Sequence, residues 1–143
     1  MVKQGKANAD ALSMRVGELT LEQINLLMTN IPVEITFADE DDIIRFYSGT
    51  KEHIFGRSPD IIGRTVQDCH PAKSHDVVNR MLKEFKSGAK DLAEFWFEKD
   101  GRLIYIRYFP IREENGEYCG VAEVTQDVTH IRDLKGEQHT LDW

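Results

Sequence analysis

The chain has 143 residues, enough for one domain, and its 18 Lys and Arg against 25 Asp and Glu give a formal net charge of −7. This acidic balance argues against a nucleic-acid-binding module and against docking on anionic lipid, since both require a basic surface. The sequence has no apolar run of the ~20 residues that a membrane span needs, and the start of the chain has no apolar region. Two cysteines are too few for a disulfide framework. We therefore expect a cytoplasmic protein with reduced thiols.

Residues 1–18 are polar and only weakly periodic, and we expect them to form a flexible tail or linker. The first clear element follows them, because Thr20 and Gln23 have the spacing of a capping box. Apolar residues then recur at helical spacing, which predicts a helix over residues 20–30 that ends before Pro32. The apolar face of this helix consists of Leu21, Ile24, Leu27 and Met28.

Two strands and a longer helix are predicted in the next part of the chain. Residues 33–38 and 43–47 flank an acidic turn and are typical of a hairpin. Residues 48–72 contain several Gly and Pro residues, which predict short helical turns joined by loops. A helix then runs from an N-cap at Ser74 to a stop at Gly88. Its apolar stripe consists of Val77, Val78, Met81, Leu82 and Phe85.

The second half of the chain predicts three consecutive strands and a final helix. The strands cover residues 91–98, 102–112 and 118–128. Asp100 and Gly101 form a strong two-residue hairpin signal between the first two strands, and Asn115 and Gly116 form another before the third. A short charged helix is expected over residues 130–138.

This order of elements predicts the α+β class. The first hairpin can pair with the later three-stranded meander only by crossing over through the middle helices. The expected result is a five-stranded antiparallel sheet with helices packed on one face and an N-terminal flanking helix. The domain is expected to occupy residues 19–138, with residues 139–143 as a C-terminal tail.

Three segments of the chain resemble the PAS domain family, the small sensory fold of signalling proteins. The segment IFGRSPDIIGR at residues 54–64 is similar to the family's glycine-containing run before its long helix. The strand pair joined by KDGR at residues 99–102 is the second match. The segment VTQDVT at residues 124–129 is similar to the family's final strand and its exit toward a helix. The resemblance covers roughly residues 20–135 and implies a PAS fold.

Four shorter motifs resemble a bacterial and archaeal PAS subgroup that is often found C-terminal to hemerythrin-like domains. They are CHPAKS at 69–74, AEFW at 93–96, IRYF at 106–109 and LDW at 141–143. The family resemblance implies a sensory or interaction module that binds a small ligand or a partner and signals through its flanking helices to other signalling domains. Flanking helices of the family commonly pack against a second copy, so we expect a homodimer through Leu21, Ile24, Leu27 and Met28.

Cys69, His70 and His75 form the densest cluster of potential metal ligands in the chain. Thiolate and imidazole both suit transition metals, and heme iron accepts either as an axial ligand. Heme-binding members of the resembled family take their ligand from the long helix, which makes His75 the candidate for heme iron. A heme-based gas or redox sensor is one alternative, and a structural role for all three residues is the other. The sequence leaves the identity of any cofactor unknown.

A second candidate site lies on the last strands and the longer helix. One hypothesis is a ligand cavity between the sheet and the helices, in which Arg107 pairs with a carboxylate of the ligand. The alternative is a filled core, with Arg107 on the outer face pairing with Glu94 or Glu123 across strands. The candidate lining residues are Met81, Trp96, Arg107 and Phe109, and the same hypothesis counts Phe95, Phe97 and Tyr105 among the aromatic residues that close the cavity.

Enzyme motifs are missing from the sequence, which contains no nucleophile elbow, no Walker loop and no paired-histidine zinc motif. We therefore predict a protein without catalytic activity. A third alternative is a small enzyme that uses Cys69 as its nucleophile and His70 or His75 as the base. Neighbouring residues on a loop rarely bring a thiol and an imidazole into the required geometry, so this alternative ranks last.

Overall fold

The computed structural model describes residues 10–50 and 54–143. Within the predicted tail, residues 1–9 lie outside the described part, and the remainder differs from the expectation. There the chain forms a small antiparallel hairpin of β1 (Ala11–Ser13) and β2 (Glu18–Thr20). Each strand has only three residues, too few for the alternation over about 4–8 residues from which a strand is predicted.

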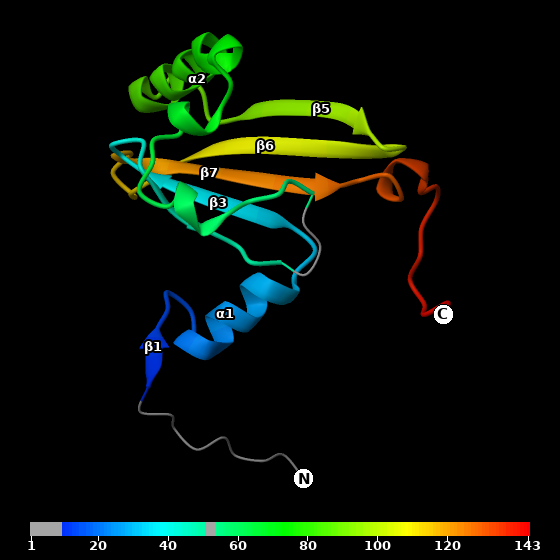
Figure 1. Ribbon diagram of the computed structural model, residues 1–143. Coiled ribbons are helices and arrows are strands. Elements are labelled where there is room, and N and C mark those ends of the chain that lie inside the picture. The colour runs from blue at the N-terminus through cyan, green and yellow to red at the C-terminus, as the bar shows by residue number, and fades with distance from the viewer. Residues whose placement is uncertain (1–9, 51–53) are drawn as a thin grey trace.

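The predicted helix is confirmed as α1 (Leu21–Asn30), and so is its capping box. The hydroxyl of Thr20 accepts a hydrogen bond from the Gln23 backbone N–H at 3.1 Å, and the Gln23 side chain accepts one from the Thr20 N–H at 2.9 Å. None of the residues of α1 is buried. The helix and the β1–β2 hairpin lie away from α2 (His75–Ser87), below the sheet in Figure 1.

Five strands form one antiparallel sheet in the order β4-β3-β7-β6-β5, which confirms the predicted fold class. The first hairpin joins the C-terminal meander through β3 and β7, where Phe37 pairs with Ala122. The residue Gly120 has φ +145°, and a Cβ atom there would collide with the carbonyl oxygen of Ala38, so this close crossing requires glycine. The strands are β3 (Glu34–Asp39), β4 (Ile44–Tyr47), β5 (Ala93–Lys99), β6 (Arg102–Arg112) and β7 (Tyr118–Asp127).

The two predicted hairpin turns of the meander are confirmed. Asp100 and Gly101 have φ values of +51° and +77°, the paired positive values of a tight two-residue turn. Gly116 has φ +89°, and its N–H donates to the carbonyl of Glu113 at 2.9 Å. These backbone conformations explain why an Asp-Gly and an Asn-Gly pair stand between the strands.

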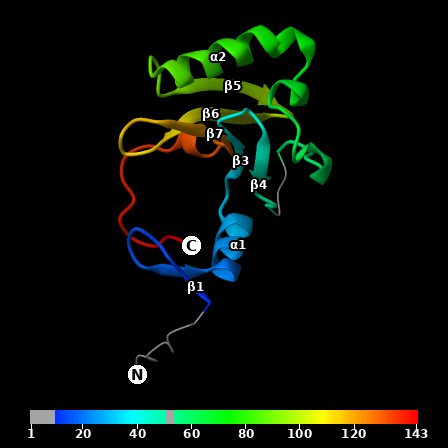
Figure 2. The ribbon, with the colours of Figure 1, turned by 90° about the vertical axis from the view of Figure 1, so that its left-hand side faces the viewer.

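Helical segments cover one face of the sheet, which we call the inner face, and the opposite face is called the outer face. Figures 1 and 2 show α2 lying along the β5 side of the sheet. Gly88 ends α2 in the left-handed conformation with φ +82°, as the sequence predicts. Three 3-10 turns precede the helix: η1 (Pro59–Ile61), η2 (Gln67–Cys69) and η3 (Ala72–Ser74).

The hydrophobic core forms between α2 and the inner face. The predicted apolar stripe of α2 is buried except at Val77, which remains 52% exposed. Ile104 of β6 is fully buried, which fixes the inner face as the side that carries Ile104, Ile106 and Tyr108. The main core cluster contains Ala38, Ile44, Val66, Val78, Met81, Leu82, Phe85 and Val121.

The predicted C-terminal helix over residues 130–138 is wrong. The chain forms only one short turn, η4 (Ile131–Asp133), and Leu134 then adopts an extended backbone. Ile131 and Leu134 are 54% and 61% exposed, so no tertiary packing supports a helix here. Gly136 has φ +66°, which breaks any continuation, and a helix this short is unstable without packing. Among the described residues, no helix is long and apolar enough to cross a membrane.

Candidate ligand-binding cavity

A cavity of about 800 Å³ lies between the inner face of the sheet, α2 and the loop that carries residues 54–64. Its walls carry several aromatic rings. Phe55 of the loop lies against Phe97 of β5 with ring centroids 6.2 Å apart, and Phe95 meets Tyr108 edge to face at 5.8 Å. The volume falls within the range of pockets that hold small organic molecules, about 300–1,000 Å³.

Polar side chains form a row across the middle of the inner face. Thr36 of β3 pairs with Glu123 of β7, and Glu123 pairs with Tyr108 of β6, so the three side chains are neighbours on adjacent strands. We call these three residues the polar row. Burial raises the pKa of the Tyr108 phenol, and the charge and hydrogen bond of the Glu123 carboxylate raise it further. Tyr108 therefore stays protonated at neutral pH.

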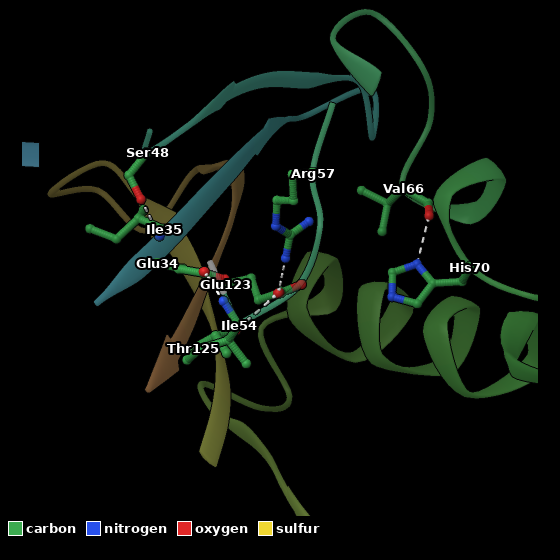
Figure 3. Close-up of polar contacts among 9 residues, drawn as sticks. All are labelled: Glu34, Ile35, Ser48, Ile54, Arg57, Val66, His70, Glu123 and Thr125. Atoms are coloured by element: carbon green, nitrogen blue, oxygen red, sulfur yellow. Dashed lines mark hydrogen bonds and ion pairs between the residues drawn. The ribbon is translucent and has the colours of Figure 1, made fainter. Parts of the chain in front are cut away.

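Arg57 reaches the polar row from the loop. Its Nη2 atom donates to Oε1 of Glu123 at 2.5 Å, and the hydroxyl of Thr125 donates to the same oxygen at 3.2 Å. The side chains of Arg57 and Glu123 are only 18% and 11% exposed, so this ion pair is largely removed from solvent. Figure 3 shows Arg57 pointing down from its loop onto Glu123.

Two polar atoms of the cavity wall are buried without a hydrogen-bond partner among the described residues. They are the hydroxyl oxygen of Thr36 and Nε of Arg57. Leaving such a group unpaired costs about 1–3 kcal/mol. A molecule in the cavity that bonds to both atoms would recover this free energy.

His70 presents a defined ring nitrogen to the cavity. Its Nδ1 lies 2.8 Å from the carbonyl oxygen of Val66. Because a carbonyl only accepts, this contact places a proton on Nδ1, and in the neutral ring Nε2 then carries a lone pair. Figure 3 shows the ring directed toward the side where Arg57 and Glu123 lie. Nε2 is thus available as an acceptor or as a metal ligand.

The predicted cluster of metal ligands is only partly assembled at the cavity. Cys69 and His70 line it, together with Met81 of α2. His75 does not, and its Nε2 lies 3.0 Å from the backbone oxygen of His70. Burial raises the pKa of the Cys69 thiol, and among the described residues neither imidazole bonds to its sulfur. These contacts give a nucleophilic role for Cys69 no support.

Trp96, Arg107 and Phe109 lie on the outer face, away from the cavity. Side chains alternate between the two faces along a strand, so these three residues lie on the other face of the sheet from Phe95 and Tyr108. Trp96 is 66% exposed. The Arg107 guanidinium lies 5.3 Å from the Tyr105 ring and 5.4 Å from the Phe109 ring, and Nη2 donates to the Gln126 side chain at 2.9 Å. Arg107 is therefore on the outer face, as one alternative expected, but its partner is Gln126.

Several residues of the cavity were not singled out by the sequence analysis. For Tyr108 a signal existed, because it shares a strand face with Ile104 and Ile106, and the more aliphatic face of a strand is the buried one. For Arg57 and Glu123 no local signal existed, because they are 66 residues apart and meet only through the fold. Phe95 and Phe97, which were candidates for closing the cavity, do line it, and the overlooked residues are Thr36, Phe55, Arg57, Tyr108 and Glu123.

Comparisons with known proteins identify the family. The sequence profile of the PAS domain matches residues 24–129. The chain belongs to the PAS domain family. The match includes the cavity, since Thr36 and Glu123 both fall within it. No protein of curated function matches this PAS chain.

Three solved structures illustrate the likeness of this PAS domain to others. The C-terminal domain of a protein from Streptococcus mutans is 32% identical with a TM-score of 0.82, and the match covers 87% of this chain and 97% of that one. The PAS domain of a protein from Colwellia psychrerythraea is 22% identical with a TM-score of 0.54, covering 77% and 98%. A sensory box sensor histidine kinase from Vibrio cholerae is 16% identical with a TM-score of 0.52, covering 74% and 89%.

The buried ion pair of the cavity yields a stability prediction. Replacing Arg57 with Met leaves the Glu123 carboxylate buried without its cation, and we expect a loss of about 3 kcal/mol in the free energy of unfolding by urea. Adding Glu123→Gln to this variant is expected to recover at least about 1 kcal/mol, because the unpaired charge is removed.

Arg45→Met is the matched control, because Arg45 is 57% exposed and pairs with Asp39 at 2.6 Å. The Asp39 side chain is 16% exposed, but it keeps its hydrogen bonds to the backbone N–H groups of Asp41 and Ile43, so we expect a loss of less than about 1 kcal/mol. A loss in Arg57→Met no larger than the loss in Arg45→Met would contradict the role assigned to the buried pair.

Proposed function

We propose that this PAS domain is a non-catalytic sensory module that binds a small molecule in the cavity and signals through its terminal segments. The observation that carries this proposal is the pair of unpartnered buried polar atoms on Thr36 and Arg57 in a cavity of about 800 Å³. The Vibrio cholerae sensor histidine kinase, which shares the fold, is consistent with a role in signalling. Other signalling domains are the proposed partners.

Signal transmission is proposed to run through β3 and β7. These central strands carry Thr36 and Glu123, and they are also the strands nearest to the two ends of the domain. Helix α1 ends four residues before β3, and β7 leads directly to Thr129. The Thr129 hydroxyl accepts from the Leu103 N–H at 2.9 Å, which ties the exit of β7 to the start of β6. A ligand that favours one arrangement of these strands shifts the population of the attached segments.

A homodimer through α1 is part of the proposal. Leu21 and Leu27 are 63% and 48% exposed, and Ile24 and Met28 are half-buried. The helix buries none of its residues within its own chain, so its apolar face is free to pack against a second copy. We also propose a cytoplasmic location, which is consistent with the free thiols of Cys69 and Cys119. Membership of the hemerythrin-associated subgroup is proposed on the sequence motifs alone.

Heme binding is the second candidate function, and His70 is the observation that favours it. An imidazole whose Nδ1 is bonded to a carbonyl presents Nε2 as a metal ligand with a fixed ring orientation. The aromatic walls suit a porphyrin ring, and Arg64 of the lining could pair with a propionate, whereas Arg57 is already neutralised by Glu123. When bound, heme supplies an iron that changes oxidation state or takes up a gas.

The sensory proposal predicts a ligand-dependent rise in melting temperature. At a concentration one hundred times its Kd, a ligand adds about 2.7 kcal/mol of stability, which corresponds to about 5–10 °C for a chain of this length. A screen of colourless metabolites and cofactors measures it. Trp96→Ala on the outer face is expected to keep the shift, and Val77→Trp at the cavity wall to reduce it. A broad screen without any shift would count against the proposal.

The dimer proposal predicts a mass of about 33 kDa in light scattering coupled to size-exclusion chromatography, twice the chain mass of 16.5 kDa. Leu27→Glu places a charge in the apolar face of α1 and is expected to give the 16.5 kDa monomer. Leu26→Glu makes the same substitution on the opposite side of α1, at a residue that is 54% exposed, and is expected to remain dimeric. A wild-type chain that elutes as a monomer at high concentration refutes the dimer.

The heme candidate predicts a Soret band on titration with hemin. Among the described histidines, His70 is the one that lines the cavity, so the band is expected to be lost in His70→Ala and to persist in His75→Ala. A preparation that remains colourless after hemin is added excludes this candidate. Loss of the band in His75→Ala alone would instead make His75 the ligand.

A further inference from the structure

The charges that line the cavity already compensate one another. Arg57 forms its ion pair with Glu123 at 2.5 Å. Among the described residues, the other charged side chains of the lining are Arg64 and Asp68, which have opposite signs and are exposed to solvent. A charged ligand beside the buried ion pair would leave water without meeting an unpaired opposite charge there, and a carboxylate on Arg57 would also approach Glu123. Burying a charge in this way is costly, so the cavity disfavours anions and cations alike.

The polar atoms that line the cavity favour a ligand that carries both a hydrogen-bond acceptor and a hydrogen-bond donor. Nε of Arg57 can only donate, so it needs an acceptor on the ligand. Nε2 of His70 carries a lone pair when Nδ1 donates to Val66, so it needs a donor. The hydroxyl of Thr36 can serve either group. A pure hydrocarbon would leave the buried atoms of Thr36 and Arg57 unpaired.

The walls indicate the shape of the ligand. Phe55, Phe95, Phe97 and Tyr108 line one region of the cavity and come from the loop, β5 and β6. Aromatic rings pack on one another in offset or edge-to-face geometry, which favours a flat aromatic ligand over a flexible chain. The volume of about 800 Å³ has room for two fused rings or more.

We infer that the cavity selects an uncharged, flat aromatic compound that carries both a hydrogen-bond acceptor and a donor, such as a bicyclic aromatic amide or lactam. Arg57 and Thr36 bond to its polar edge, and Glu123 acts as an internal counterion that keeps Arg57 from attracting anions. This inference rests on the proposed function, because it specifies the ligand class of the same cavity.

The test compares four matched probes by isothermal titration calorimetry with the wild-type chain. The probes are 2-naphthamide, 2-naphthoate, 2-naphthylmethylamine and naphthalene. The uncharged amide is expected to bind at least tenfold more tightly than the anion, the cation or the hydrocarbon. In Glu123→Gln the counterion is lost, the glutamine oxygen still accepts from Arg57, and the preference is expected to shift toward 2-naphthoate.

Thr36→Val separates a role in binding from a role in folding. The substitution removes an unpartnered buried hydroxyl, so the ligand-free protein is expected to become more stable, while the affinity for 2-naphthamide falls about fivefold. Trp96→Ala, on the outer face, is expected to leave all four affinities unchanged. A merely structural role for Thr36 would lower stability and leave the affinity unchanged.

The outcomes distinguish the ligand class from the proposed function. Tighter binding of 2-naphthoate or of the amine to the wild-type chain overturns the ligand class and leaves a ligand-binding cavity in place. Binding of naphthalene as tight as that of the amide overturns the role of the polar atoms. Failure of all four probes overturns the inference, and the broad metabolite screen then decides the proposed function on its own.

Discussion

The structure depends on one carboxylate that lies in the middle of the covered face of the sheet. Glu123 occupies the central strand β7, where an apolar residue would complete an ordinary core. Its charge is compensated by Arg57, which reaches it from a loop 66 residues away in sequence. The ion pair fixes this loop above the sheet, because breaking it would leave a buried charge unpaired. The space between the loop, α2 and the polar row is the cavity.

The two faces of the sheet carry different kinds of side chains. The inner face carries the cavity and the core, whereas the outer face carries Arg107 between two aromatic rings and the exposed ring of Trp96. Both faces share the backbones of β3 and β7, and these strands are nearest to α1 and to the C-terminal segment. A change at the polar row thus acts on the strands that lead to both ends of the domain.

Most of the fold was predictable from local signals, because each signal matched a local physical requirement. The capping box at Thr20 and the Asp100-Gly101 turn are both satisfied by neighbouring residues. The hairpin over residues 11–20 and the absence of a helix over residues 130–138 were not predicted, since strands of three residues are too short to show a periodicity and a short helix needs packing partners. Of the candidate site, Cys69, His70 and Met81 reach the cavity wall. Alternation alone does not tell which face of β6 is covered, so Arg107 stays open between the cavity and the outer face at the level of sequence, and Phe109 is only a candidate for the cavity wall.

The proposed small molecule is held in the cavity through the polar row. Native mass spectrometry of the freshly purified chain tests this binding most directly, followed by the same measurement after denaturation. We expect a population with the added mass of one uncharged organic molecule per chain, lost on denaturation and reduced in Thr36→Val. A chain that carries only its own mass under gentle conditions, together with a Thr36→Val variant that is indistinguishable from it, would contradict the account.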